Sequence, residues 1–212
     1  MGSLKISQLN KFINIKLHNP GQCAGIFFYL CGCSIFVLKS YIKMRYFLIG
    51  FMGSGKSYWG KKWSEHFNLP LIDLDHEIEK AAGISIAQIF EHKGERNFRK
   101  LEKQILQRFL KQDNYIMSCG GGTPCFFNNM KQMNRKGVTI YLKGAPAILA
   151  DRLKDEKTKR PLINDMSDEA LVSFIAKKLE ERRICYAQSF YHLETDFITN
   201  DNFERILRRH GS

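Results

Sequence analysis

The sequence predicts an α/β protein whose parallel sheet is covered by helices on both faces. From Met44 onward, short apolar runs alternate with longer segments of helical periodicity, which is the pattern of a parallel sheet with crossover helices. One apolar run leads directly into a glycine-rich loop, and a later one ends in three consecutive glycines. The length of 212 residues is sufficient for one domain with a sizeable core.

The elements follow from this alternation in chain order. The apolar runs predict a five-stranded sheet with strands at Arg45–Ile49, Leu71–Asp73, Tyr115–Ser118, Val138–Leu142 and Phe197–Thr199. The periodic segments predict helices at Ser57–Phe67, His76–Ala82, Ser85–His92, Glu95–Gln112, Phe126–Arg135, Pro146–Leu153, Asp168–Ser189 and Asn202–Arg209. The charged, non-periodic segment 154–167 contains Pro161, and its length is typical of a mobile lid.

The first 43 residues differ from the rest of the chain. They contain five lysines and no acidic residue, and Ala24–Leu38 is apolar and uncharged. This apolar run is shorter than the roughly 20 residues that span a bilayer. Met44 stands directly before the first predicted strand. We therefore predict an N-terminal extension at 1–43 that is not part of the domain, followed by a domain at 44–212. A membrane anchor formed by residues 24–38 is the alternative.

Composition narrows the class of protein. The formal charge is +12, of which the extension supplies five, and a pocket for anionic substrates accounts for part of the remainder. The sequence lacks the basic and aromatic stripe of single-strand binders, so no nucleic-acid partner is expected. The six cysteines form no C-x₂-C pair and show no zinc spacing. This usage predicts a reducing, cytoplasmic location.

The run Gly50–Ser57 (GFMGSGKS) matches the phosphate-binding loop G-x-x-x-x-G-K-[ST]. A predicted strand precedes it and a predicted helix follows it, which directs backbone N–H groups and a helix N-terminus at a polyphosphate. Lys56 would reach the β- and γ-phosphates, and the Ser57 hydroxyl would join Mg²⁺. A chance match in a loop is the alternative, and the correct flanks on both sides argue against it.

Asp73 and Asp75 lie at the carboxyl end of the second predicted strand, the edge at which open α/β sheets bind ligands. One carboxylate can hold Mg²⁺ through water while the other faces a substrate hydroxyl. An ordinary surface pair or a helix N-cap is the alternative, because a predicted helix begins directly after Asp75.

Three further motifs carry arginine or glycine. Arg99 and Glu102 are three residues apart on a predicted helix, so they form either a surface ion pair or a site where Arg99 presents its fork to a carboxylate. The run Gly120–Gly122 costs chain entropy, and a close backbone approach to a ligand explains it better than a flexible turn. Arg160 lies in the predicted lid, and Arg182 precedes Tyr186 by four residues.

These motifs together resemble the shikimate kinase family. The resemblance extends from about Arg45 to Thr199 and includes the loop G-x-x-G-x-G-K-S, D-x-D, G-E-x-x-F-R-x-x-E, G-G-G and R-P-L, followed by R-x-x-x-Y. Phosphate-binding loops are common to many kinases, whereas G-E-x-x-F-R together with G-G-G is specific to few. The resemblance implies a three-layer sandwich of the P-loop kinase type with a mobile lid.

The resemblance also implies roles for single residues. The ATP site would comprise Gly53, Ser54, Gly55, Lys56, Ser57, Tyr58, Arg152 and Arg160. The shikimate site would comprise Asp75, Arg99, Gly120, Gly121, Gly122 and Arg182. Lys56, Asp75 and Arg160 would be catalytic, and Ser57 and Asp73 would position Mg²⁺. Ile184 stands where the family often has proline, and Arg183 is adjacent, so the choice of Arg182 depends on its spacing to Tyr186.

The activity that the resemblance implies is transfer of the γ-phosphoryl group of ATP to the 3-hydroxyl of shikimate, in aromatic amino acid biosynthesis. ATP and Mg²⁺ would be required, and a monomer is expected. Another small-molecule P-loop kinase, such as a gluconate kinase, is the nearest alternative. A nucleotide-binding module without turnover is the alternative from another class.

Overall fold

The computed structural model describes residues 27–31, 34–38, 44–159 and 161–210. The chain divides into two compact units, Met1–Ser40 and Tyr41–Ser212. The elements of the second unit are β3 (Arg45–Ile49), α1 (Lys56–Phe67), β4 (Leu71–Asp73), α2 (Leu74–Ala82), α3 (Ile86–Phe109), β5 (Tyr115–Ser118), the 3₁₀ helix η2 (Thr123–Cys125), α4 (Asn129–Lys136), β6 (Val138–Lys143), α5 (Pro146–Leu153), the 3₁₀ helices η3 (Lys154–Lys159) and η4 (Pro161–Ile163), α6 (Asp168–Tyr186), β7 (Tyr191–Glu194) and α7 (Asn200–His210).

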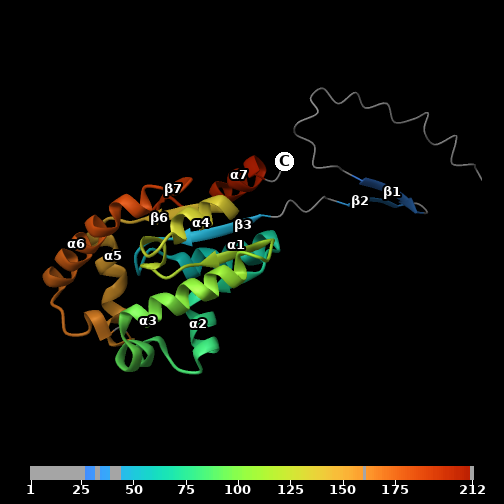
Figure 1. Cartoon of the computed structure of the whole chain (residues 1–212). Coiled ribbons are helices and arrows are strands. Elements are labelled where there is room, and N and C mark those ends of the chain that lie inside the picture. Colours follow the sequence, from blue (N-terminus) through green and yellow to red (C-terminus); the bar gives the residue numbers. More distant parts are fainter. Residues whose placement is uncertain (1–26, 32–33, 39–43, 160, 211–212) are drawn as a thin grey trace, which may run out of the picture. The chain divides into compact units, whose positions relative to one another are not determined.

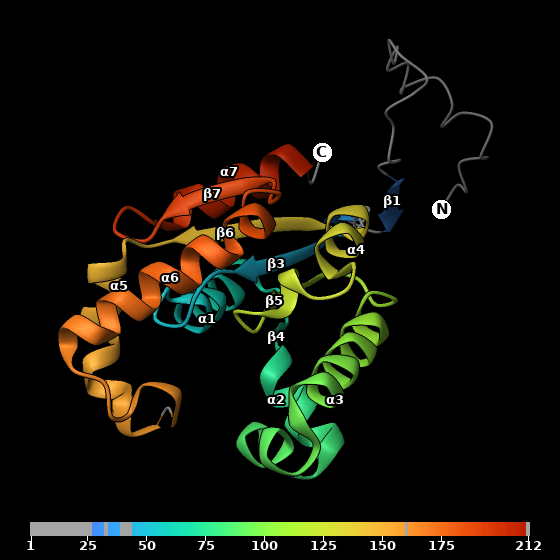
Figure 2. The ribbon, with the colours of Figure 1, turned by 60° about the vertical axis from the view of Figure 1, so that its left-hand side comes forward.

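The second unit contains a five-stranded sheet of order β4-β5-β3-β6-β7. Each pair of neighbouring strands is parallel, with Phe47 opposite Met117 in β5 and Leu48 opposite Ile140 in β6. Helices surround the sheet, as Figure 2 shows. The predicted α/β class with a five-stranded parallel sheet is confirmed. Because all strands point the same way, the segments that follow β3, β4 and β5 emerge at one edge of the sheet.

Two hydrophobic clusters cover the two faces of the sheet, and β3 contributes alternate residues to each. Phe47 and Ile49 belong to a cluster that includes residues of α2, α3, α4 and α6. Tyr46 and Leu48 belong to a second cluster that includes residues of α1 and α7. In that second cluster the rings of Trp63 and Phe203 stack at 4.6 Å. The strand is therefore apolar on both faces, as a buried central strand requires.

The predicted strand at Phe197–Thr199 is wrong, because the last strand of the sheet is β7. Leu142 of β6 pairs with Leu193 of β7. The residues of β7 alternate between half-buried and exposed, so this edge strand lacks a continuous apolar run that would identify it. Phe197 instead is 79% exposed, while Ile198 is buried in the core just before α7.

Several predicted helices have different boundaries in the structure. The two helices predicted at Ser85–His92 and Glu95–Gln112 form one element, α3, and Gly94 within it has non-helical angles of φ 71 and ψ 168. The interruption that the sequence predicted between them is thus present as a kink. Helix α2 begins at Leu74, two residues earlier than expected, so Asp75 lies in its first turn.

The segment predicted as a lid, 154–167, is not an irregular loop along its described residues. It contains η3 and η4, and Ile163 is fully buried in a cluster with residues of α5 and α6. Arg160 lies outside the described residues. Closure of this segment over a ligand remains a prediction.

The first unit contains two described strands, β1 (Phe27–Cys31) and β2 (Ser34–Leu38), which pair antiparallel with Phe27 opposite Leu38 (Figure 1). Among the residues that the structure describes, no helix has the length and apolar character needed to cross a bilayer. The boundary between extension and domain near Met44 remains a prediction.

Candidate active site

The loop between β3 and α1 has the backbone of a phosphate cradle. Gly50, Gly53 and Gly55 have φ values of 145, 77 and 84, which side-chain-bearing residues rarely adopt. At Gly50 a Cβ atom would lie 2.6 Å from the carbonyl oxygen of Leu142, so any other residue would displace the neighbouring strand. The loop then leads into α1, which begins at Lys56. This geometry directs the N-terminus of α1 at a bound anion.

Lys56 folds back over the loop. Its ammonium group donates hydrogen bonds to the carbonyl oxygens of Gly50 at 2.9 Å and Phe51 at 2.8 Å. Ser54, in the same loop, is fully buried, and its hydroxyl has no hydrogen-bond partner among the described residues. Buried polar groups in proteins are nearly always hydrogen-bonded. An acceptor or donor that enters the loop, such as a phosphate oxygen, would satisfy this hydroxyl, so the cradle fits a polyphosphate.

Asp73 and Asp75 have different structural positions at the end of β4. One carboxylate oxygen of Asp73 accepts hydrogen bonds from the backbone N–H groups of Asp75 at 3.0 Å and His76 at 3.3 Å. Asp73 is thus the N-cap of α2, and the capping alternative applies to this residue. Asp75 does not cap the helix, and its carboxylate lies against Gly120.

The pKa of Asp75 is raised from 3.8 to about 6. Burial is the largest cause, and the neighbouring carboxylates of Asp73 and Glu102 add to it. The positive charges of Lys56 and Arg99 lower the pKa and offset part of this effect. Groups with perturbed pKa values concentrate at functional sites. At neutral pH Asp75 is therefore ionised and has an affinity for protons much higher than that of an exposed aspartate.

Arg99 and Glu102 form an ion pair that is largely buried, so the alternative of an ordinary surface pair does not apply. Glu102 is fully buried and accepts hydrogen bonds from Arg99 Nη1 at 2.9 Å and from Thr123 Oγ1 at 2.6 Å. At the opposite edge of the Arg99 guanidinium, Nη2 donates to Glu95 Oε1 at 3.2 Å. The Glu95 side chain is 58% exposed. The Arg99 guanidinium also lies 4.1 Å from the centre of the Phe126 ring.

Each glycine of the run Gly120–Gly122 lies against a different residue that the sequence singled out. A Cβ atom on Gly120 would lie 2.8 Å from Asp75 Oδ1, and one on Gly121 would lie 3.0 Å from Arg182 Nη1. A Cβ atom on Gly122 would lie 2.6 Å from Arg99 Nη2. The absence of side chains at these three positions allows one carboxylate and two guanidinium groups to converge on the carboxyl end of β5.

Arg182 connects this group to the phosphate loop. Its guanidinium carbon lies 5.3 Å from the centre of the Phe51 ring, and Phe51 is one of the two residues whose carbonyls accept from Lys56. The hydroxyl of Tyr186, one turn further along α6, donates to the carbonyl oxygen of Gly121 at 2.6 Å. Arg99 and Arg182 therefore lie on the same side of the molecule as Lys56, around one glycine run.

Arg152 and Tyr58 lie at the margin of this group. Arg152 pairs with Asp196 at 3.1 Å, and its Nη1 lies 3.5 Å from the carbonyl oxygen of Gly53 in the phosphate loop. Tyr58 is 63% exposed, and its ring contacts Trp59 edge-on at 5.3 Å. Arg160 lies outside the described residues, so its position relative to the loop is not assigned.

The sequence did not indicate that Thr123 belongs to the site. It also did not indicate that Glu102 is buried and contacts both Arg99 and Thr123. A spacing of three residues between Arg99 and Glu102 indicated an ion pair, but only the fold shows that both lie against the glycine run. Thr123 directly follows the glycines, and this position was the one available signal.

A divalent cation bound at this site would take part of its ligands from the phosphate groups of a bound nucleotide. Among the residues that the structure describes, no cluster of three or more His, Cys, Asp or Glu side chains could hold a metal ion. At phosphate sites Mg²⁺ is usually held by one or two protein ligands together with the phosphates themselves. Ser57, at the start of α1, and Asp73, the N-cap of α2, are the side chains predicted for this role, and the assignment remains a prediction.

Comparisons with known proteins show which family this chain belongs to. The family model described as shikimate kinase matches residues 52–209. The shikimate kinase of Azobacteroides pseudotrichonymphae is 44% identical over 165 residues, covering 77% of this chain and 97% of that protein. The crystal structure of shikimate kinase from Bacteroides thetaiotaomicron has a TM-score of 0.71 at 37% identity, covering 78% of this chain and 95% of that one. The shikimate kinase of Acinetobacter baumannii in complex with shikimate has a TM-score of 0.69 at 27% identity, covering 80% of this chain and 93% of that one.

Proposed function

Because this chain belongs to the shikimate kinase family, we propose that it transfers the γ-phosphoryl group of ATP to the 3-hydroxyl of shikimate, giving shikimate 3-phosphate and ADP. This reaction is a step of aromatic amino acid biosynthesis. The observation that carries the proposal is the convergence of Asp75, Arg99 and Arg182 on Gly120–Gly122, beside the carbonyls that accept from Lys56. Gluconate also carries a carboxylate, so membership of the shikimate kinase family is what favours shikimate over gluconate as the acceptor.

The phosphates of ATP are held by the loop Gly50–Ser57. The backbone N–H groups at the start of α1 and the hydroxyl of Ser54 meet the phosphate oxygens, and Lys56 exchanges its two carbonyl acceptors for the β- and γ-phosphates. Arg152, beside Gly53, and Tyr58 contact the nucleotide further from the reacting phosphate. Arg160 reaches the transferring group when the segment 154–167 closes.

Shikimate is held by its carboxylate between Arg99 and Arg182. The edge of Arg99 that now contacts the exposed carboxylate of Glu95 has the geometry for a second, bidentate partner. Glu102 holds the other edge of the same guanidinium in a fixed orientation. The backbone N–H groups of Gly121 and Gly122 add donors at positions that no side chain blocks.

Asp75 orients the acceptor hydroxyl and takes its proton as the phosphoryl group transfers. A raised pKa makes this carboxylate a better proton acceptor while it remains ionised at neutral pH. The transition state of phosphoryl transfer is loose, so alignment and positive charge matter more than the strength of the base. Lys56 supplies that charge from the nucleotide side and Arg160 from the closing segment.

Ser57 and Asp73 would hold Mg²⁺, which would supply positive charge against the phosphates. Ser57 would bind it directly, and Asp73 would hold it through water, because one of its oxygens already caps α2. The enzyme acts as a monomer in the cytoplasm. Cys119, Cys125 and Cys185 are free thiols in the described part of the chain, and this agrees with a reducing compartment.

The test is an incubation of the full chain with ATP, Mg²⁺ and shikimate, followed by mass detection of the phosphorylated acid. Gluconate and nucleoside monophosphates are the comparison acceptors, and the Lys56→Ala variant controls for contaminating kinases. Formation of phosphorylated shikimate by the wild type alone supports the proposal. Nucleotide binding without any phosphorylated product would instead indicate a binding module, and a preference for another acceptor would indicate a different small-molecule kinase.

A further inference from the structure

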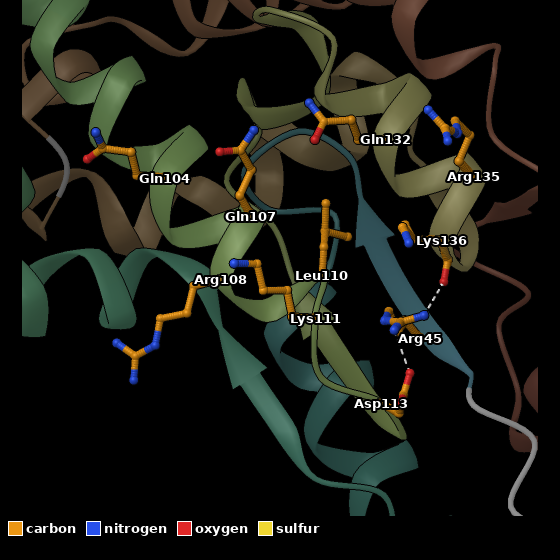
Figure 3. Close-up of a pocket in the computed structure, with 10 residues that line it drawn as sticks. All are labelled: Arg45, Gln104, Gln107, Arg108, Leu110, Lys111, Asp113, Gln132, Arg135 and Lys136. Carbon is orange, nitrogen blue, oxygen red and sulfur yellow. Dashed lines mark hydrogen bonds and ion pairs between the residues drawn. The ribbon is translucent and has the colours of Figure 1, made fainter.

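A cavity lies at the opposite edge of the sheet from the candidate active site. Its volume is about 690 Å³, and it is bounded by the second half of α3, by α4 and by the start of β3 (Figure 3). The phosphate loop follows the other end of β3. A strand rises about 3.3 Å per residue, so the five residues of β3 place this cavity about 16 Å from the phosphate loop.

The lining of this cavity is strongly basic. It contains one carboxylate, Asp113, and five cations: Arg45, Arg108, Lys111, Arg135 and Lys136. Arg45 is engaged within the fold, because it pairs with Asp113 and donates to the carbonyl oxygen of Lys136 at 2.7 Å. Within the described ranges, none of the other four cations has a carboxylate at ion-pair distance.

Helix ends explain only part of this charge. Arg108 lies in the last turn of α3, and Arg135 and Lys136 lie in the last turn of α4, where cations offset the negative end of a helix. Each such end is equivalent to roughly half an elementary charge, so the two ends account for about one of the four uncompensated cations. About three positive charges therefore remain without a counterpart in the fold.

Amide groups accompany the cations. Gln107 of α3 and Gln132 of α4 face each other across the cavity in Figure 3. In the described part of the chain, neither side-chain amide forms a hydrogen bond with another residue. Leu110, which is 6% exposed, provides an apolar contact between them. Cations with uncharged donors around a small apolar contact are the chemistry that phosphate groups on an organic molecule require.

We propose that this cavity binds a small phosphorylated molecule carrying about three negative charges, at a site separate from the catalytic centre. The volume lies within the range of small-molecule sites, which is about 300 to 1,000 Å³. A nucleic-acid strand would need a long basic track with exposed aromatic side chains, whereas these cations line one cavity that is bounded by α3 and α4. The proposal goes beyond the phosphorylation of shikimate and does not depend on it.

The test uses inorganic tripolyphosphate as the probe and isothermal titration calorimetry as the measurement. The full chain is first saturated with ADP, Mg²⁺ and shikimate, so that the catalytic centre is filled. We expect one further equivalent of tripolyphosphate to bind. In the variant Lys111→Gln/Lys136→Gln the affinity should fall roughly tenfold, about threefold for each lost charge.

The matched control is Lys80→Gln/Lys177→Gln, which removes two exposed lysines on α2 and α6. This control should bind tripolyphosphate as the wild type does. Both double variants should keep the wild-type unfolding temperature and turnover, because all four lysines are exposed and lie outside the catalytic machinery.

Three results would overturn the proposal. The first is no further equivalent once the catalytic centre is filled. The second is an equal loss of affinity in the cavity variant and the control, because general attraction to a basic protein would then explain the binding. The third is tight binding to phosphatidylserine vesicles that tripolyphosphate does not displace, which would assign this face to a membrane surface instead.

Discussion

Replacing Asp75 with asparagine should stabilise the protein and slow the reaction. The pKa of this carboxyl in the folded protein is about 6, against 3.8 without the surrounding structure. Each pKa unit corresponds to 1.36 kcal/mol, so the ionised carboxylate costs the folded state about 3 kcal/mol at neutral pH. Asparagine has nearly the same shape and no charge, so Asp75→Asn should recover most of this free energy.

The pH dependence of the stability gained in Asp75→Asn shows whether the ionisation of Asp75 is its cause. A raised pKa in the folded state means that the stability contributed by protonated Asp75 is fully present below about pH 4 and is lost as the pH rises through about 6. The difference in unfolding free energy between Asp75→Asn and the wild type should therefore grow from about 1.6 kcal/mol at pH 5 to about 3 kcal/mol at pH 8.

Urea unfolding at several pH values between 5 and 8 measures this difference in free energy. Steady-state kinetics measures the accompanying loss of activity. We expect kcat of Asp75→Asn to fall by about 10²-fold or more, the usual contribution of a general base. Glu65→Gln, which neutralises an exposed carboxylate on α1, is the control and should change the unfolding free energy little at any pH. A stability difference that does not vary with pH would refute the assignment of the raised pKa to Asp75, and a wild-type kcat would refute its role in the reaction.

Four further predictions follow from the same geometry. The wild-type kcat/KM should fall about tenfold per pH unit below pH 6, and this fall should be absent from Asp75→Asn; a flat wild-type profile would contradict an ionised Asp75 in the active form. Gly122→Ala should raise KM for shikimate at least tenfold and leave KM for ATP unchanged, because the added methyl group would lie 2.6 Å from Arg99 Nη2. An equal rise in both constants would place Arg99 outside the acceptor site. Glu102→Gln should lower the unfolding free energy by about 3 kcal/mol, because it removes the buried one of the two carboxylates that pair with the largely buried Arg99. Glu95→Gln at the exposed edge should cost under about 1 kcal/mol, and similar losses in urea unfolding would mean that burial of Glu102 does not matter. A chain that begins at Met44 should keep the kcat of the full chain, and loss of turnover or of folding would show that residues 1–43 belong to the domain.

Local patterns in the sequence were sufficient for most of the sheet. The strands β3, β4 and β5 agree with the predicted residues because each is a short apolar run bounded by a turn signal. The edge strand β7 was not predictable in this way, because Tyr191–Glu194 is only half buried and becomes a strand through pairing with β6. Its position depends on residues about 50 positions earlier in the chain, which no local pattern contains.

The composition of the site was also largely predictable. Glycines, carboxylates and a lysine that end successive parallel strands must meet at one edge of the sheet, because parallel strands share their direction. For this reason the sequence alone places Lys56, Asp75 and Gly120–Gly122 close together. The arginines were harder to place, since Arg99 and Arg182 lie on helices and an arginine on a helix is usually at the surface.

The sequence by itself determined the first four strands of the five-stranded sheet, the phosphate loop and the residue types available for chemistry, because these depend on neighbours within a few positions. Only the tertiary structure decided that Glu102 is buried, that each of three glycines makes room for one charged group, and that Asp75 holds its proton to about pH 6. Burial and charge–charge distances depend on which distant segments pack together, and it is these distances that turn a set of ordinary residues into a site.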